Sequence, residues 1–432
     1  MPQRLNSLDA NFAAAFDALV AQKRGASSDV AGVVSAIIGE VHSKGDTALC
    51  QYTEKFDGLK LDPAGLRITA EEIESACAAV DAEARAALEL AASRIEAYHK
   101  RQMPKSERYT DDAGVELGGR WTPIEAVGLY VPGGKASYPS SVLMNAVPAR
   151  AAGVARIVMC VPTPKGVLNP LVLVAAKIAG VDEIYRVGGA QAIAAMVYGT
   201  DTIKPVDKIV GPGNAFVAEA KRQVFGHVGI DMIAGPSEIL VVADAKNDPA
   251  VTAIDLLSQA EHDETAQSIL ITDDAGFADA VCAAVDDHLS TLASAPLARQ
   301  SWNDFGAVIV LSELDEAPAL IDRLAPEHLM IATDDPDALF DQVHHAGAAF
   351  LGRETPEAIG DYVAGSNHVL PTGRSARFSS GLTIYEFLKR TSIVRAGKAG
   401  LAALGPAAQR LAEAEGLPAH ARSVSIRLEK GE

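Results

Sequence analysis

A regular alternation of short β-branched segments and longer helical segments runs through this 432-residue chain from about Ala126 to about residue 352. The first strand candidate is AVGLYV (126–131), and the helical pattern SSVLMNAVPARAAG (140–153) follows it. Helices of ten or more residues between strands indicate parallel βαβ units, because parallel strands need a long crossover connection. The alternation therefore predicts an α/β protein with mostly parallel sheets.

The alternation covers enough of the chain to build more than one sheet. Further strand candidates are RIVMCV (156–161), EIYRVG (183–188), DKIVG (207–211), EILVVAD (238–244), SILITD (268–273), AVIVL (307–311), LMIA (329–332) and AAFLG (348–352). A chain of this length also exceeds one ordinary domain. We therefore expect two consecutive α/β units, each with an open sheet.

The two ends of the chain follow a different pattern. Residues 1–24 form a short amphipathic start, and helical spacing follows at 29–40 and 69–100. Segment 101–125 is polar, contains Gly and Pro, and predicts a connection. After about Thr383 the pattern is helical. Such a tail has little core of its own, so it must pack on the body of the protein or on another subunit.

Composition excludes several classes of function. The formal charge of −18 argues against nucleic acid or an anionic membrane as the main partner, because phosphate binding needs a basic surface. The first residues carry no apolar signal segment, and no stretch approaches the roughly 18 apolar residues of a membrane helix. The four cysteines form no CxxC motif, which favours reduced thiols. We expect a cytoplasmic enzyme that acts on a small molecule.

Three glycine-containing turns follow predicted parallel strands. They are VPGGKASYPSS (131–141), VGGAQA (187–192) and GPGN (211–214). Ligands of open α/β sheets bind at the carboxyl ends of the strands, so three such turns favour a nucleotide or similar ligand. GPGNAF has Phe216 where a dinucleotide fingerprint needs a third small residue, although Asp231 lies where a ribose ligand would stand. Phosphate contact at the helix N-terminus stays open beside that interpretation.

The dipeptide Glu-His occurs twice and is chemically versatile. In SQAEHD (258–263) a predicted helix places Gln259 and His262 on one face, which is either the start of a metal site or an ordinary solvated face. In APEHLM (325–330) the pair Glu327-His328 lies at a junction before a strand. We expect an exposed acid/base pair or a charged turn there.

Two later segments carry single histidines. GDYVAGSNHVLPTG (360–373) predicts a structured loop that contains Asp361 and His368, and such loops often carry function. LPAHARS (417–423) places His420 in the helical tail, where spacing alone favours a structural or surface role.

Together these segments resemble the histidinol dehydrogenase family. The resemblance spans nearly the whole chain and rests on VGLYVPGGKASYPSSVLMNAVPA, GPGNAFVAEAK, DMIAGPSEILVVAD, LLSQAEHD, PEHL, IGDYVAGSNHVLPT and EGLPAHA, in this order. It implies oxidation of L-histidinol to L-histidine through L-histidinaldehyde, in two NAD-dependent hydride transfers that end histidine biosynthesis. It also implies one Zn²⁺ per subunit and NAD as cofactors.

The resemblance also assigns roles to residues of this sequence. It implies Gln259, His262, Asp361 and His420 as zinc ligands, and Glu327 and His328 as the catalytic acid/base pair. The substrate-binding residues it implies are Ser237, Gln259, His262, His328, Asp361, His368, Glu415 and His420. For NAD it implies Tyr130, Gln191 and Asn214.

The fold that the resemblance implies has two incomplete Rossmann-like domains, one inserted in the other. We expect an N-terminal helical segment at 1–25, a discontinuous domain at 26–129 and 238–382, and an inserted NAD-contacting domain at 130–237. The helical tail at 383–432 is expected to be exchanged in a homodimer, so that Glu415 and His420 complete the partner's site.

Three other functions compete with this interpretation. One is a paralogous zinc- and NAD-dependent enzyme that oxidises another small alcohol. Another is a zinc hydrolase, although the HExxH motif is absent and the glycine turns would then have no purpose. A non-catalytic binding module would leave the Glu327-His328 pair without a role.

Overall fold

A six-stranded parallel sheet forms one half of the body of the protein. The computed structural model describes residues 1–22, 30–133 and 138–429. The strands are β1 (Gln3–Asn6), β9 (Glu238–Ala243), β10 (Gln267–Thr272), β11 (Ala307–Val310), β12 (His328–Ala332) and β13 (Ala348–Leu351), in the order β1-β11-β10-β9-β12-β13. All neighbours in this sheet run parallel.

A five-stranded parallel sheet forms the other half. Its strands are β4 (Ala126–Tyr130), β5 (Arg156–Cys160), β6 (Glu183–Tyr185), β7 (Lys208–Val210) and β8 (Gly229–Ile230), in the order β6-β5-β4-β7-β8. If β1 is left out and the strands of each sheet are numbered along the chain, both sheets have the order 3-2-1-4-5. The order reverses beside β9 in the larger sheet and beside β4 in the smaller one, as in doubly wound folds. This confirms the prediction of two mostly parallel sheets.

Helices cover both faces of the six-stranded sheet. They are α1 (Phe12–Ala21), α10 (Pro249–Ala260), α11 (Ala275–Leu289), α12 (Ala295–Phe305), α13 (Ala317–Leu324), α14 (Pro336–Phe340) and α15 (Glu357–Tyr362). One apolar core joins β9–β12 to α10, α11 and α12, and another joins the opposite face to α1 and α13. The N-terminal segment is therefore part of this sheet and its core.

The helices of the five-stranded sheet include most of the N-terminal quarter of the chain. They are α2 (Ala31–Lys44), α3 (Asp46–Asp57), α4 (Ala70–Ala79), α5 (Ala82–Lys100), α6 (Pro139–Ala152), α7 (Pro170–Ile178), α8 (Gly189–Tyr198) and α9 (Ala215–Val224). Apolar residues of α2 and α3 pack with α8 and α9, and those of α4 and α5 pack with α6 and α7. Residues 30–100 thus lie on the smaller sheet, which differs from the predicted grouping of 26–129 with 238–382.

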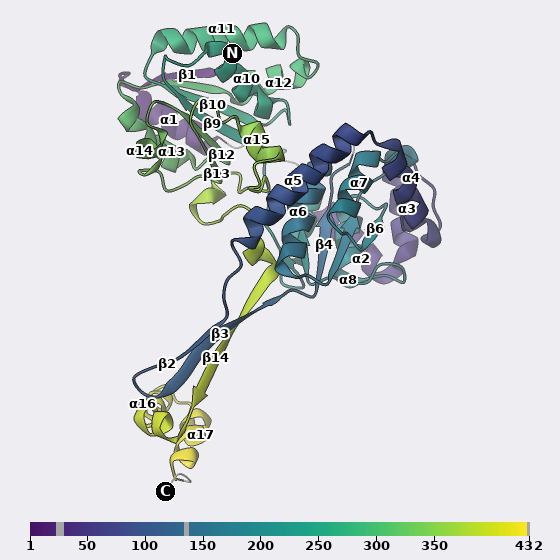
Figure 1. The fold of residues 1–432 in the computed structure, drawn as a ribbon, viewed down its shortest axis with the longest axis vertical. Coiled ribbons are helices and arrows are strands. Elements are labelled where there is room, and N and C mark those ends of the chain that lie inside the picture. The colour runs from purple at the N-terminus through teal and green to yellow at the C-terminus, as the bar shows by residue number, and fades with distance from the viewer. Residues whose placement is uncertain (23–29, 134–137, 430–432) are drawn as a thin grey trace.

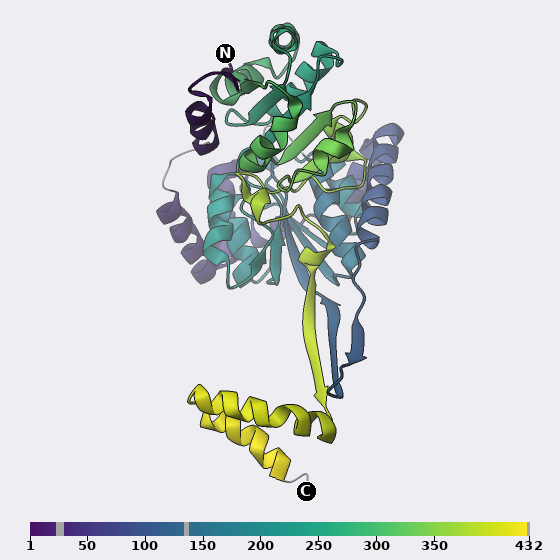
Figure 2. The same ribbon diagram turned by 90° about the vertical axis from the view of Figure 1, so that its left-hand side faces the viewer.

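A long antiparallel arm leaves the body and carries the C-terminal helices (Figures 1 and 2). It consists of β2 (Glu107–Thr110), β3 (Val115–Pro123) and β14 (Leu388–Ala396), and α16 (Lys398–Ala414) and α17 (Pro418–Glu429) pack together at its end. The predictions that 101–125 is only a connection and that the chain is helical from Thr383 were wrong. Most side chains of β2 and β14 are exposed, so these strands lack the alternation that marks a half-buried strand.

The remaining elements are short. The 3-10 turns are η1 (Pro63–Leu66), η2 (Pro164–Gly166), η3 (Leu314–Glu316), η4 (Ser375–Arg377) and η5 (Ile384–Phe387). The four cysteines are free thiols, of which only Cys160 is fully buried. Among the described residues, no helix has the length and apolar character needed to cross a membrane.

Candidate active site

A pocket of about 670 Å³ lies between the two sheets and is lined by both. Pro132 and Asn214 reach it from the carboxyl ends of β4 and β7, as the glycine turns predicted. The larger sheet lines the pocket with the amino ends of its strands, since Ser237 precedes β9 and His328 is the first residue of β12. The turn at 131–141 lies partly outside the described residues.

The carboxyl edge of the larger sheet is occupied by ion pairs. Arg353, just after β13, contacts Asp244 at 2.6 Å and Asp334 at 3.0 Å. Asp244 follows β9 and Asp334 follows β12, so the three residues join the ends of three strands. These ion pairs lie at the edge of the six-stranded sheet opposite the one that lines the pocket.

His328 is held from both ring nitrogens and is almost fully buried. Its Nδ1 lies 2.9 Å from the carbonyl oxygen of Glu238, which can only accept a hydrogen bond, so Nδ1 carries the proton. Its Nε2 lies 3.3 Å from Oδ1 of Asp361 and lines the pocket. The imidazole therefore has a fixed orientation, with Nε2 directed toward the carboxylates of Asp361 and Glu357.

Glu327 is locked to Glu238 by a reciprocal pair of hydrogen bonds. The backbone N–H of Glu238 donates to Oε2 of Glu327 at 2.9 Å, and the backbone N–H of Glu327 donates to Oε2 of Glu238 at 3.2 Å. Glu327 is only 7% exposed. The expectation of an exposed acid/base pair was wrong, because β9 and β12 are neighbours and enclose both residues.

The surroundings shift the pKa values of both members of this pair upward. Burial raises the pKa of Glu327 to about 8, because an ionised carboxylate loses its hydration there. Burial by itself lowers the pKa of His328, but the nearby carboxylates of Glu327, Asp361 and Glu357 outweigh it and raise the value to about 10. The two residues form a coupled acid/base pair whose protonation depends on the charges around it.

Gln259 and His262 lie at the end of α10. The helix stops at Ala260, so His262 lies in the following turn, where its backbone N–H donates to the carbonyl of Gln259. The prediction that both lie on one face of a helix was therefore wrong, yet both line the pocket. Desolvation by the pocket wall lowers the pKa of His262, and the charge of Asp361 opposes that change.

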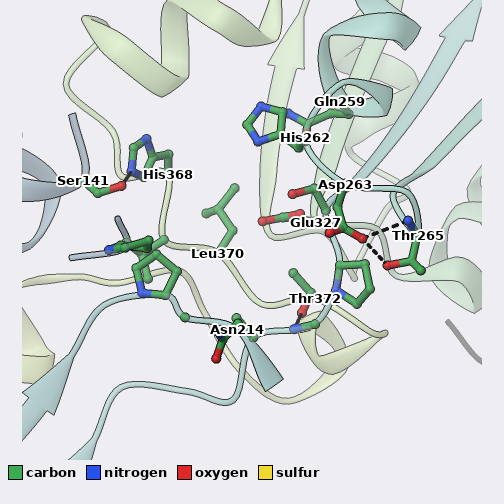
Figure 3. Close-up of a pocket in the computed structure, with 18 of the residues that line it drawn as sticks. Ser141, Asn214, Gln259, His262, Asp263, Thr265, Glu327, His368, Leu370 and Thr372 are labelled. Atoms are coloured by element: carbon green, nitrogen blue, oxygen red, sulfur yellow. Dashed lines mark hydrogen bonds between the residues drawn. The ribbon is translucent and has the colours of Figure 1, made fainter. Parts of the chain in front are cut away.

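Asp361 and His368 come from α15 and the loop that follows it. Nδ1 of His368 donates to the carbonyl oxygen of Asp361 at 3.0 Å, while its Nε2 lies 3.3 Å from Oγ of Ser141. Figure 3 shows His368 and Ser141 on one wall of the pocket and Gln259, His262 and Glu327 across from them. Burial raises the pKa of Asp361, but His328 more than offsets this and brings it down to about 2.

Glu357 is a buried carboxylate at this site that the sequence analysis missed. It lies one helical turn before Asp361 on α15, and Oε1 is 3.7 Å from Nε2 of His328. One ligand atom each from His328, Glu357 and Asp361 lies within 4.8 Å of the others, a spacing compatible with a metal ion. Its i, i+4 spacing from Asp361 could have indicated that both carboxylates share one helix face. That inference requires the short helix α15, which the sequence did not predict.

The side chains of Gln259, His262 and Asp361 fit a zinc ion chemically. Zinc binds imidazole nitrogen and carboxylate or amide oxygen. Oε1 of Gln259 is buried and has no hydrogen-bond partner among the described residues. A buried polar atom without a partner is costly, and a cation beside it would remove that cost.

Glu415 and His420 are not brought to this pocket by their own chain. Glu415 directly follows α16 and His420 lies on α17, and both are exposed. These helices lie at the far end of the arm, away from the body (Figures 1 and 2). A site that includes them needs the tail of another copy.

The three residues expected to contact NAD have different environments. Asn214 lines the pocket and caps α9 by accepting the backbone N–H groups of Phe216 and Val217. Tyr130 and Gln191 are buried, and the hydroxyl of Tyr130 accepts the N–H of Gly189. Gln191 lies in the first turn of α8, and Tyr130 contacts that turn from β4.

Asp231 has a structural partner where the sequence suggested a ribose ligand. Its Oδ2 accepts the backbone N–H of Gly211 at 2.8 Å, and its Oδ1 pairs with Lys221. The carboxylate is 1% exposed, so it faces the interior beneath the GPGN turn. The ribose interpretation of Asp231 was wrong.

Comparison with known proteins gives a consistent result over the full length. The family model described as histidinol dehydrogenase matches residues 20–428. Histidinol dehydrogenases of Rhodospirillum rubrum and Rhizobium meliloti are each 62% identical over 432 residues, which is 100% of this chain and of the relative. The crystal structure of histidinol dehydrogenase from Elizabethkingia anophelis superposes with a TM-score of 0.95 at 37% identity, covering 99% of this chain and 98% of that one.

Proposed function

The chain belongs to the histidinol dehydrogenase family, and from that premise we propose how its residues oxidise histidinol in histidine biosynthesis. The observation that carries the proposal is the placement of Glu327 and His328, buried side by side, in one pocket with Gln259, His262 and Asp361. An acid/base pair and a set of zinc-compatible ligands thus face the same ligand space.

Zinc and NAD are the cofactors that the family implies. When bound, zinc orients the imidazole and amino groups of the substrate, and NAD supplies the hydride acceptor for each of the two oxidation steps. Gln259, His262 and Asp361 would hold the metal, and His420 of a second subunit would complete the set. The donors match the nitrogen and oxygen ligands that zinc accepts.

His328 acts as the general base for the substrate hydroxyl. Nδ1 keeps its proton and donates it in a hydrogen bond to the carbonyl oxygen of Glu238, so Nε2 is the nitrogen that exchanges protons with the substrate. A metal held by Asp361 would offset the negative charge that raises the pKa of His328, and the neutral imidazole is the form that accepts a proton. The same nitrogen takes a proton again in the second oxidation.

Glu327 acts between the two oxidation steps. Its buried carboxylate has a pKa raised toward neutrality, which makes it a stronger base than an exposed carboxylate. We assign it the proton taken from the water that hydrates L-histidinaldehyde. Ser237 and His368 line the same pocket and would contact the substrate, joined by Glu415 of a second subunit.

The NAD site is proposed at the carboxyl edge of the five-stranded sheet. Asn214 lies on the pocket wall there and would contact the cofactor directly. Tyr130 supports the adjoining turn at Gly189 and Gln191 is part of that turn, so both would act where the cofactor lies against it. Ligands of open parallel sheets occupy this edge because the strand order reverses there.

The position of the C-terminal helices supports a homodimer with exchanged tails, which we propose here. The arm carries α16 and α17 away from the pocket of its own chain, while the ligand set includes His420 (Figure 1). We propose that each tail completes the site of the partner subunit. We also propose a cytoplasmic location, where NAD and the intermediates of amino-acid biosynthesis are available.

The stoichiometry of NADH formation tests the four-electron reaction. Zinc-loaded protein is supplied with L-histidinol and excess NAD, and NADH absorbance is compared with substrate consumed. A ratio near two is expected, and a ratio near one would contradict the two-step oxidation. A panel of other small alcohols in the same assay distinguishes a paralogous alcohol dehydrogenase.

A further inference from the structure

Glu357 joins two of the side chains that face the pocket. Its carboxylate is 3% exposed, and Oε1 accepts a hydrogen bond from Nε2 of Gln259 at 2.5 Å. Oε2 accepts a hydrogen bond from Oγ of Ser258 at 2.9 Å. Both oxygens of Glu357 are therefore engaged by residues of α10.

This contact decides which way the amide of Gln259 points. The amide presents its NH₂ group to Glu357, because Nε2 is the atom that donates to the carboxylate. The amide oxygen is then directed to the opposite side, where Oε1 is buried without a partner among the described residues. A glutamine without this contact could turn its amide over and present NH₂ to a cation.

We propose that Glu357 is a positioning residue for the metal: it fixes the amide of Gln259 so that Oε1 faces the ion. The inference rests on the proposed ligand set and adds a residue that this set does not contain. Glu357 is assigned to act through Gln259, because Oε1 accepts a hydrogen bond from the Gln259 amide and Oε2 accepts one from Ser258. Partners that orient metal ligands in this way typically contribute about 10- to 100-fold in metal affinity.

The affinity of the metal-stripped, full-length protein for Zn²⁺ tests this role, measured by competition with a chromophoric chelator. Glu357→Leu removes the acceptor and is expected to weaken zinc binding by roughly 10- to 100-fold. Gln259→Ala removes the ligand itself. The double variant should bind zinc no more weakly than Gln259→Ala alone, because Glu357 has nothing left to orient.

A charge-conserving exchange tests the same contact without an apolar substitution. Gln259→Glu places two carboxylates against each other and should weaken zinc binding. Adding Glu357→Gln restores a hydrogen bond between an amide N–H at position 357 and a carboxylate at position 259. The double variant should therefore regain most of the zinc affinity. Ser258→Ala, which removes only the contact to Oε2, is the matched control and should stay close to wild type.

The outcomes separate this inference from the proposed function. Additive losses for Glu357→Leu and Gln259→Ala, or no recovery in the exchanged pair, would overturn the positioning role. Wild-type affinity in Glu357→Leu beside a clear loss in Gln259→Ala would also overturn it while the ligand set stands. Wild-type affinity in Gln259→Ala would instead overturn the ligand set on which the inference rests.

Discussion

The ammonium of Lys221 and the carboxylate of Asp231 form a buried ion pair directly beneath the turn that carries Asn214. Lys221 also donates to the carbonyl of Gly211 at 3.0 Å, while Asp231 accepts the N–H of the same glycine at 2.8 Å. The two side chains thus hold both polar groups of one residue in the GPGN turn. The N-terminus of α9 owes its position in the pocket wall to this pair.

Asp231→Ala is therefore expected to destabilise the protein and to weaken NAD binding. It leaves a buried, unpaired ammonium, and breaking a buried pair in this way typically costs about 3–5 kcal/mol. Urea unfolding measures the stability, and the KM for NAD reports on the turn. The double variant Lys221→Met, Asp231→Asn removes both charges and keeps an acceptor for Gly211, so it should recover more than half of the loss. A double variant less stable than Asp231→Ala would contradict this account.

Glu327→Gln should impair aldehyde oxidation more than alcohol oxidation. The carboxylate is the base for water, and loss of general-base catalysis typically costs about 10²–10⁴-fold. An acid whose pKa is raised to about 8 is ionised only above that pH, so aldehyde oxidation by the wild type should rise as pH increases through that range.

The measurement is the initial rate of NADH formation from each substrate between pH 6 and 10. The glutamine variant should lose the rise near pH 8 in aldehyde oxidation. His328→Asn is the comparison, since it should damage both half-reactions. Equal losses of Glu327→Gln in both half-reactions would show that the two residues do not divide the work in this way.

Asp255 is a buried carboxylate on α10 whose ionisation opposes folding. Burial raises its pKa from 3.8 to about 6. A raised folded-state pKa in an acid means that the charged form is disfavoured in the folded protein. The penalty is absent below about pH 4, grows up to pH 6, and above that reaches about 3 kcal/mol for a shift of this size.

Asp255→Asn should therefore stabilise the protein at pH 8, by up to about 3 kcal/mol, and have little effect at pH 4. Urea unfolding at the two pH values measures this difference. Asp201→Asn is the matched control, since Asp201 is exposed and its substitution should change the stability little. An equal effect of Asp255→Asn at both pH values would rule out ionisation as the cause.

The sequence predicted the two sheets because their strands are buried on both faces and read as short apolar runs between helices. It could not predict the arm, because β14 is mostly exposed and its residues carry no period of two. Nor did it predict the burial of Glu327, which comes from pairing between β9 and β12, 89 residues apart at Glu238 and Glu327. The spacing of residues along the chain indicates a single helix or strand. The burial of a side chain and the set of residues that share a site depend on contacts between segments far apart in the sequence.

Complementation between two variants that are impaired in aldehyde oxidation, with that step as the measured activity, tests the exchange of tails. In a mixture of His420→Asn and Glu327→Gln chains, half of the dimers formed at random contain one of each. If tails are exchanged, one site of such a dimer combines an intact body with an intact tail, and the other combines both defects. About a quarter of wild-type activity should then return when the two variants are co-expressed or refolded together, by the combinatorics of random pairing in a symmetric dimer.

A tail that serves its own chain would leave the mixture inactive, since every site then carries one defect. The matched control pairs Glu327→Gln with His328→Asn, which both lie in the body, and should regain nothing under either arrangement.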